Sequence, residues 1–151
     1  MRAALLLTLL AAGCAAPTLT QLRPALLDQG DFLGTLAREE RRHAIFLGRH
    51  GAAIAEAERF AQKAETARSG RLPELEPAEG AAMEATRARL LAALAAPAKE
   101  KCPVFAALAF SRYDAWAERQ RAWPNGEEAE GFRRDVEENL AALEGPCTRA
   151  G

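Results

Sequence analysis

The chain has 151 residues and a formal net charge of −1, which is the size of one domain and too close to neutral for the strongly basic face of a nucleic-acid-binding protein. Only 6% of its residues are aromatic, while alanine, leucine, arginine and glutamate are abundant, and all four favour helices. This composition predicts an all-α fold, a small helical bundle whose alanine-rich core buries little apolar area per residue.

The first fourteen residues combine Arg2, an apolar run over residues 3–12, and Gly13 immediately before Cys14. This arrangement is typical of a secretory signal peptide, and the run is too short to cross a membrane as a helix. The segment 10–14, Leu-Ala-Ala-Gly-Cys, resembles the lipobox of bacterial lipoproteins. The resemblance implies that residues 1–13 are removed and that Cys14 becomes the lipid-modified (palmitate-bearing) first residue. The alternative is an ordinary signal peptide that ends near a cysteine.

The chain then divides into a tether and a folded region. Residues 14–29 contain Pro17 and Pro24, which block helix propagation, and we expect them to link the lipid to the body. Residues 30–148 form the predicted helical domain. Cleavage after Gly13 would remove one charged residue, Arg2, and leave a formal charge of −2.

We expect one long helix over residues 31–68, starting at Asp31 as N-cap and ending at Gly70. Its apolar residues recur at helical spacing. Gly48 and Gly51 lie in its middle, where a kink or break is expected, since each glycine costs about 1 kcal/mol relative to alanine.

Three further helices are predicted over residues 78–96, 103–122 and 127–143. Prolines bracket a short connector over residues 98–102, and Pro103 suits a first helical position. The turn 124–126, Pro-Asn-Gly, is so short that the last two helices must form an antiparallel hairpin.

The hairpin places two cysteines together. Cys102 and Cys147 lie equally far from the centre of the turn, so they should sit at the same height at its open end. With Cys14 lipidated, they are an even pair in an oxidising compartment, and we predict a disulfide between them. The bond would close a loop of 46 residues, worth roughly 3–5 kcal/mol. The alternative is two free, buried thiols.

Residue groups that could carry chemistry are few. His43 and His50 are two helical turns apart, too far to share one metal ion, and we interpret them as solvated surface histidines. No serine has a histidine nearby in the sequence, and the glycines lack a phosphate-binding spacing. We therefore predict no metal site, no cofactor and no enzymatic activity.

Two surface patterns remain ambiguous. The run 38–42, Arg-Glu-Glu-Arg-Arg, could be a patch for anionic lipid, but its mixed signs favour a solvated, internally paired helix face. Tyr113, Asp114 and Trp116 could form an interaction surface for a partner or ligand. We favour the alternative that Trp116 anchors the core of the hairpin and Asp114 is a polar neighbour on its exposed side.

Three segments together resemble the helical region that precedes the peptidoglycan-binding domain of alphaproteobacterial OmpA-family envelope proteins. They are residues 59–64 (Arg-Phe-Ala-Gln-Lys-Ala), 87–94 (Arg-Ala-Arg-Leu-Leu-Ala-Ala-Leu) and 113–116 (Tyr-Asp-Ala-Trp) with Glu118 and Gln120. The likeness spans roughly residues 32–143. That family commonly has a cysteine between the Asp and the Trp, which pairs with the next helix, whereas this chain has Ala115 there. By the resemblance, a Cys102–Cys147 disulfide would be the same cross-link at another place in the hairpin. The sequence ends at Gly151, and we expect no peptidoglycan-binding domain.

These patterns predict a non-enzymatic cell-envelope lipoprotein that is anchored to a membrane through Cys14 and acts through contacts with other envelope proteins, without nucleic acid. Ala15 stands where an aspartate retains some bacterial lipoproteins in the inner membrane, so the resemblance favours the outer membrane, facing the periplasm. The alternative function is a periplasmic carrier or chaperone-like module that binds an apolar ligand in a cavity of several hundred Å³.

Overall fold

The computed structural model describes residues 30–49, 54–95, 97–145 and 147, and the regular secondary structure of these residues is helical throughout. The prediction of a small all-α bundle is confirmed. Its elements are α1 (Phe32–Arg49), α2 (Ile54–Arg68), α3 (Ala81–Ala95), α4 (Ala98–Lys101), α5 (Pro103–Ala122) and α6 (Glu127–Glu144).

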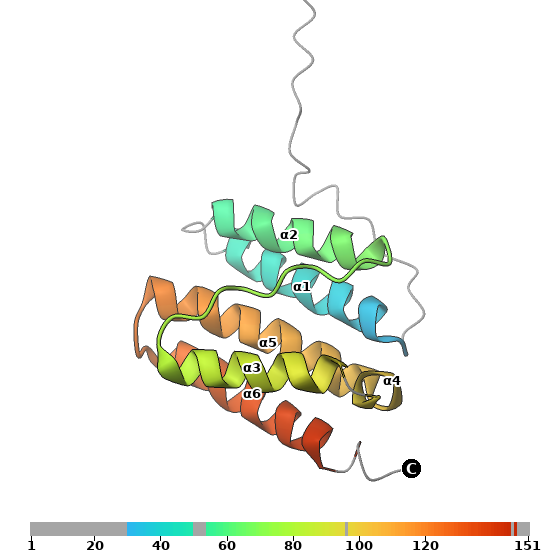
Figure 1. Cartoon of the computed structure of the whole chain (residues 1–151). Helices are drawn as coiled ribbons and strands as arrows, with labels where there is room; N and C mark the ends of the chain where they lie inside the picture. Colours follow the sequence, from blue (N-terminus) through green and yellow to red (C-terminus); the bar gives the residue numbers. More distant parts are fainter. Residues whose placement is uncertain (1–29, 50–53, 96, 146, 148–151) are drawn as a thin grey trace, which may run out of the picture.

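The expected long helix over residues 31–68 is two helices. Asp31 caps α1 by accepting a hydrogen bond from the Gly34 backbone N–H, as an N-cap aspartate should. Helix α1 ends at Arg49, and α2, which begins at Ile54, returns antiparallel along it (Figure 1). A continuous helix is therefore wrong, while the expected break lies where the glycines predicted it. Folding back lets both helices bury their apolar stripes against each other and against α5.

Helices α5 and α6 form the predicted antiparallel hairpin, with Pro103 opening α5 and three glutamates in the first turn of α6. Asn125 in the connecting turn has a positive φ of 59°, a conformation that asparagine tolerates. The disulfide between Cys102 and Cys147 is present, with the two Cα atoms 5.9 Å apart. The equal-height argument from the turn is confirmed.

Two connections position the rest of the bundle. Helix α3 packs against α5 and α6, and the one-turn helix α4 leads from α3 to the disulfide. Residues 71–80, here called the strap, have no helical structure and run between the α1–α2 pair and α3 (Figure 1). Leu75 and Glu76 of the strap are buried, so this loop is part of the interior.

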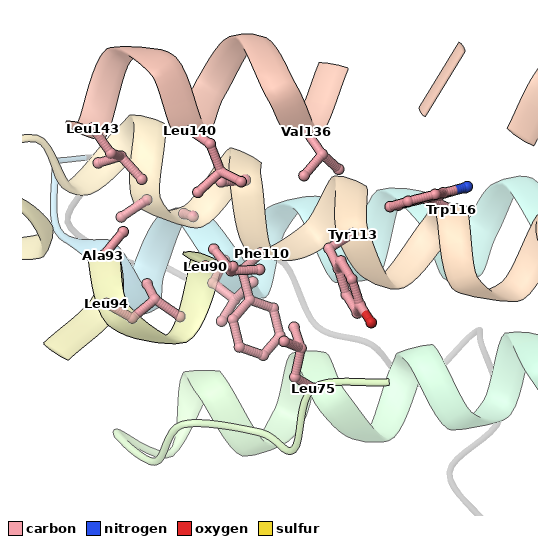
Figure 2. Packing of buried hydrophobic residues seen from close by; sticks show 14 of the residues in the cluster. Leu75, Leu90, Ala93, Leu94, Phe110, Tyr113, Trp116, Val136, Leu140 and Leu143 are labelled. Carbon is pink, nitrogen blue, oxygen red and sulfur yellow. The ribbon is translucent and has the colours of Figure 1, made fainter. Parts of the chain in front are cut away.

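Most of the apolar core lies between α3, α5 and α6. Figure 2 shows Leu90 and Leu94 of α3 facing Phe110 of α5, with Leu140 of α6 above them. Leu75 approaches Phe110 from the strap. A second, smaller cluster lies within the α1–α2 pair and is rich in alanine: Ala44, Leu47, Ala57, Phe60 and Ala61. The α1–α2 side of the bundle thus has little apolar mass of its own.

Within the described residues, no helix is both long and apolar enough to cross a membrane. The predicted signal peptide, the lipidation site Cys14 and the tether over residues 14–29 lie outside the described residues.

Candidate functional site

The most unusual feature of the interior is a group of four charged side chains where α1, α2, the strap and α5 meet. We call it the ionic cluster, and its members are Glu40, Lys63, Glu76 and Asp114. Each comes from a different element, and all four are buried. Buried charges are rare unless they are paired, so such a group indicates a special structural or functional role.

The helical phase of three of these residues explains why they are inside. Lys63 lies between Phe60 and Ala67 on the buried stripe of α2. Asp114 shares the buried stripe of α5 with Phe110, and Glu40 follows Leu36 by four residues on α1. Residues three and four apart share one face of a helix, so burying the apolar neighbours carries these charged groups into the core as well.

Lys63 and Asp114 form the centre of the cluster. The Lys63 Nζ donates to Asp114 Oδ2 at 2.6 Å and lies 2.9 Å from Glu76 Oε1. Burial alone would lower the pKa of Lys63, but the two carboxylates outweigh it and raise that pKa above its ordinary value. Burial raises the pKa of Asp114 to about 6, even though Lys63 and the Glu76 backbone N–H both favour the carboxylate.

Glu76 ties the strap to the helices. Its backbone N–H donates to Asp114 Oδ1 at 2.8 Å, and its carboxylate accepts from Lys63. Two arginines complete the contacts: Arg121 of α5 at 2.6 Å and Arg59 of α2 at 3.2 Å. Burial would raise the pKa of Glu76, but these cations, Lys63 foremost, lower it below its ordinary value. The strap is therefore held by a carboxylate that stays ionised.

Glu40 differs from the other members because neither of its carboxyl oxygens has a hydrogen-bond donor among the described residues. Burial, and next the Asp114 carboxylate, raise its pKa well above the ordinary value. An ionised carboxylate without donors would be very costly at this depth, so the folded protein favours the protonated form of Glu40.

The chemistry of this arrangement favours a structural role, in which the charged groups hold the strap and the helices together. A lysine that acts as a nucleophile or base needs a lowered pKa, whereas the ammonium of Lys63 is held by two carboxylates that raise it. The described residues contain no group of three or more histidine, cysteine, aspartate or glutamate side chains suited to a metal ion.

The interpretation of His43 as a solvated histidine is wrong. Its ring packs edge-on against Phe60 and Phe132, with centroid distances of 4.5 and 5.7 Å, and its Nε2 lies 3.7 Å from Glu118 Oε2. His43 lies seven residues after Leu36 on α1, which is its buried face. His50 is outside the described residues.

The charged run 38–42 forms some of the expected ion pairs, but it is not the expected solvated face. Glu39 and Glu40 are both buried, so the run is not a solvated face of mixed sign. Glu39 lies within 3.0 Å of Arg42 and 3.7 Å of Arg38, with Arg112 of α5 on its other side at 3.5 Å. The acidic residues thus point inward, whereas Arg38 and Arg42 are exposed and Arg41 is half-buried. Adjacent residues on a helix differ by 100° in direction, which separates the two signs.

The proposed interaction surface of Tyr113, Asp114 and Trp116 is not exposed. All three are buried, with Tyr113 and Trp116 in edge-to-face contact at 6.0 Å. The reading of Trp116 as a core residue is confirmed, but the position of Asp114 on its exposed side is wrong because Asp114 is at the centre of the ionic cluster.

Sequence reasoning missed the ionic cluster, although a signal was present. Lys63, Asp114 and Glu40 each occupy a position that the apolar periodicity of their helix assigns to the core. A buried charge is costly unless it is paired. Three charged residues in core positions on three helices are therefore expected to contact one another, which indicates a cluster.

The described residues form several open grooves with volumes from about 280 to 570 Å³. One of about 500 Å³ lies beside the ionic cluster, between α2 and the strap, and includes Arg59, Lys63, Glu74, Glu76 and Arg87 in its lining. Each of these grooves carries at least one charged side chain, which is a poor match to an apolar ligand.

Comparison of this chain with protein-family models, with curated proteins and with solved structures finds no match. The likeness to the helical region of OmpA-family envelope proteins therefore stays a prediction.

Proposed function

We propose that this chain is a non-enzymatic lipoprotein of a bacterial cell envelope, held on the periplasmic side of the outer membrane through Cys14, and that its helical bundle acts through contacts with other envelope proteins. The observation that carries the proposal is the disulfide between Cys102 and Cys147. Disulfides persist in oxidising compartments, which is where a signal sequence ending at Cys14 would deliver the chain. The export signal and the disulfide are independent features that favour the same location.

The way the interior is filled favours a module that contacts other proteins over a carrier that binds an apolar ligand. The core between α3, α5 and α6 is packed with side chains, and the open grooves on the bundle carry charged groups. Large apolar side chains remain at the surface instead, among them Phe105 at the start of α5 and Leu91 on α3, which are 44% and 43% exposed. Exposed apolar side chains of this kind suit contacts with proteins.

The lipoprotein assignment is tested by the intact mass of the protein extracted from membranes, before and after reduction, with Cys14→Ala as the control. The account predicts a parent chain that lacks residues 1–13, carries acyl mass, and gains two hydrogens on reduction. An unprocessed chain without acyl mass would contradict the proposed anchor, and a mass unchanged by reductant would contradict the oxidising compartment.

The contact role is tested separately, with a photo-crosslinking residue at Phe105 and, as control, at Glu138, an exposed polar position on α6. In intact cells we expect a discrete crosslinked species from Phe105 that Glu138 does not give. Equal, diffuse labelling from both positions would argue against a specific contact there.

A further inference from the structure

One face of α1 concentrates positive charge. Arg38, Arg41, Arg42 and Arg49 line a single groove of about 480 Å³ together with Ile45 and Phe46. The other five residues lie three, four, seven, eight and eleven positions after Arg38. They therefore form one continuous stripe on the helix, about 16 Å long at 1.5 Å per residue. We call it the basic face.

The charge of the basic face is not cancelled by its own helix. The two glutamates of the 38–42 run are buried, and burial favours the uncharged form of Glu40. The Glu39 carboxylate lies within 4 Å of three guanidinium groups at once, those of Arg38, Arg42 and Arg112. Arg41 and Arg49 form no ion pair within the described residues. Arg38, Arg42 and Arg49 therefore face outward and Arg41 is half-buried beside them, with one shared anion behind the four.

Aromatic side chains border this charge. The Arg119 guanidinium carbon lies 5.5 Å from the ring centres of both Phe46 and Trp123, so it joins the two rings at one edge of the basic face. Trp123 is 59% exposed and Phe46 is 37% exposed. Arginines beside half-exposed aromatic rings are the combination that binds a membrane interface, where the rings lie at headgroup level and the cations meet phosphate.

We propose that the basic face docks on the surface of an anionic phospholipid membrane and so orients the module on the bilayer that anchors it. This inference rests on the proposed attachment through Cys14. Sixteen residues lie between Cys14 and Asp31, and this stretch spans at most about 60 Å when extended, so the face is within reach of the surface. Anionic headgroups supply the complementary charge, at a local concentration that the tether keeps high.

The test uses the full-length Cys14→Ala chain, because it cannot be acylated at residue 14 and its binding does not depend on the anchor. Binding is measured by sedimentation with phosphatidylcholine vesicles and with vesicles containing 30% phosphatidylglycerol, and the readout is the ratio of the two partition constants. The leader, including Arg2, is the same in the parent, the variant and the control, so its contribution cancels when their ratios are compared. A blue shift of tryptophan fluorescence reports burial of Trp123, since Trp116 is already buried.

The variant is Arg41→Gln/Arg49→Gln, and the matched control is Arg71→Gln/Arg134→Gln, which removes the same charge from exposed positions on the strap and on α6. At about 1 kcal/mol for each basic residue at an anionic surface, the variant should lower the ratio about 25-fold, while the control changes it much less. Thermal unfolding of both variants should match the parent.

Equal binding of the parent to both vesicle compositions would overturn the proposal. So would a variant that binds as tightly as its control. Binding to a poly-glutamate peptide without preference for anionic vesicles would also overturn it, and would assign the basic face to an acidic protein. If the anionic preference holds while the wild-type protein carries no acyl mass, the anchor fails and the basic face remains.

Discussion

The two sides of this bundle are stabilised by different kinds of interaction. The side formed by α3, α4, α5 and α6 has a large apolar core and a covalent bond, Cys102–Cys147. The side formed by α1, α2 and the strap has a small alanine-rich cluster and relies on the ionic cluster around Lys63 and Asp114. One side is stabilised by a bond that no change of pH or salt affects, and the other by groups that titrate.

The difference matters because the two devices act on different states. A disulfide restricts the chain whenever the segments that it joins unfold, locally or globally, so its effect does not depend on the packing around it. A buried ion pair contributes only when the folded geometry is intact, and it costs free energy as soon as one partner is lost. We therefore expect the strap side to respond to single charge changes and the disulfide side to tolerate them.

The largest effect should come from removing the disulfide. Cys102→Ala/Cys147→Ala frees a loop of 46 residues, and the free energy of unfolding should fall by about 4 kcal/mol, measured by urea denaturation. Reductant should produce a similar loss in the parent and no further loss in the variant. A variant as stable as the oxidised parent would show that the bond contributes nothing to this side.

Next in size is Lys63→Met, which keeps the apolar stem and removes the cation from between Asp114 and Glu76. We expect a loss of about 3 kcal/mol, because two buried carboxylates lose their shared partner. The control is Arg68→Met on the same helix, whose ion pair with Glu65 is exposed and should leave the denaturation midpoint nearly unchanged. Equal effects of the two substitutions would contradict the role of the ionic cluster.

Glu40→Gln should stabilise the protein at alkaline pH. The folded chain holds a proton on Glu40 that the unfolded chain releases above its ordinary pKa of 4.5, so the stability of the parent falls as pH rises above that value. Between pH 6.5 and 8 the loss is at most about 1.4 kcal/mol per pH unit for one proton. Denaturation across this range should show a flatter profile for Glu40→Gln and an advantage of about 1–2 kcal/mol at pH 8. A parallel profile would mean that Glu40 is ionised in the folded state.

The smallest effect is expected at Arg89, which joins α3 to α6 through Glu137 at 2.7 Å and Glu144 at 2.8 Å. The Arg89 side chain is 42% exposed, so Arg89→Gln should cost only about 0.5 kcal/mol, and the difference should vanish in 1 M salt. A loss as large as that of Lys63→Met would show that exposed pairs hold this bundle as strongly as buried ones.

The disulfide side could be predicted well from the sequence because its two helices are consecutive and joined by a short turn. Proline at 103 and the turn before Gly126 define the ends of α5 and α6, and a short turn permits one arrangement of two helices. Once the hairpin is given, Cys102 and Cys147 must meet. No information from the rest of the chain is needed.

The strap side could not be predicted in the same way because no short turn sets which residues of its segments meet. Lys63 and Asp114 are 51 residues apart, and Asp114 and Glu76 are 38 apart. Periodicity shows that a charged residue is on a buried stripe, but it does not show which stripe faces it. A single long helix over residues 31–68 would place Glu40 and Lys63 far apart. Only the fold-back of α2 on α1 brings them near each other.

The most direct test of the two-sided account is hydrogen exchange measured by mass spectrometry, on the full chain and on two variants, Cys102→Ala/Cys147→Ala and Lys63→Met. The account predicts that Lys63→Met accelerates exchange mainly in α2 and the strap, whereas loss of the disulfide accelerates it mainly in α4 and the last turns of α6. If both variants accelerate exchange in the same segments and to the same degree, the bundle opens as one unit, and the division into a stapled side and an ion-held side is wrong.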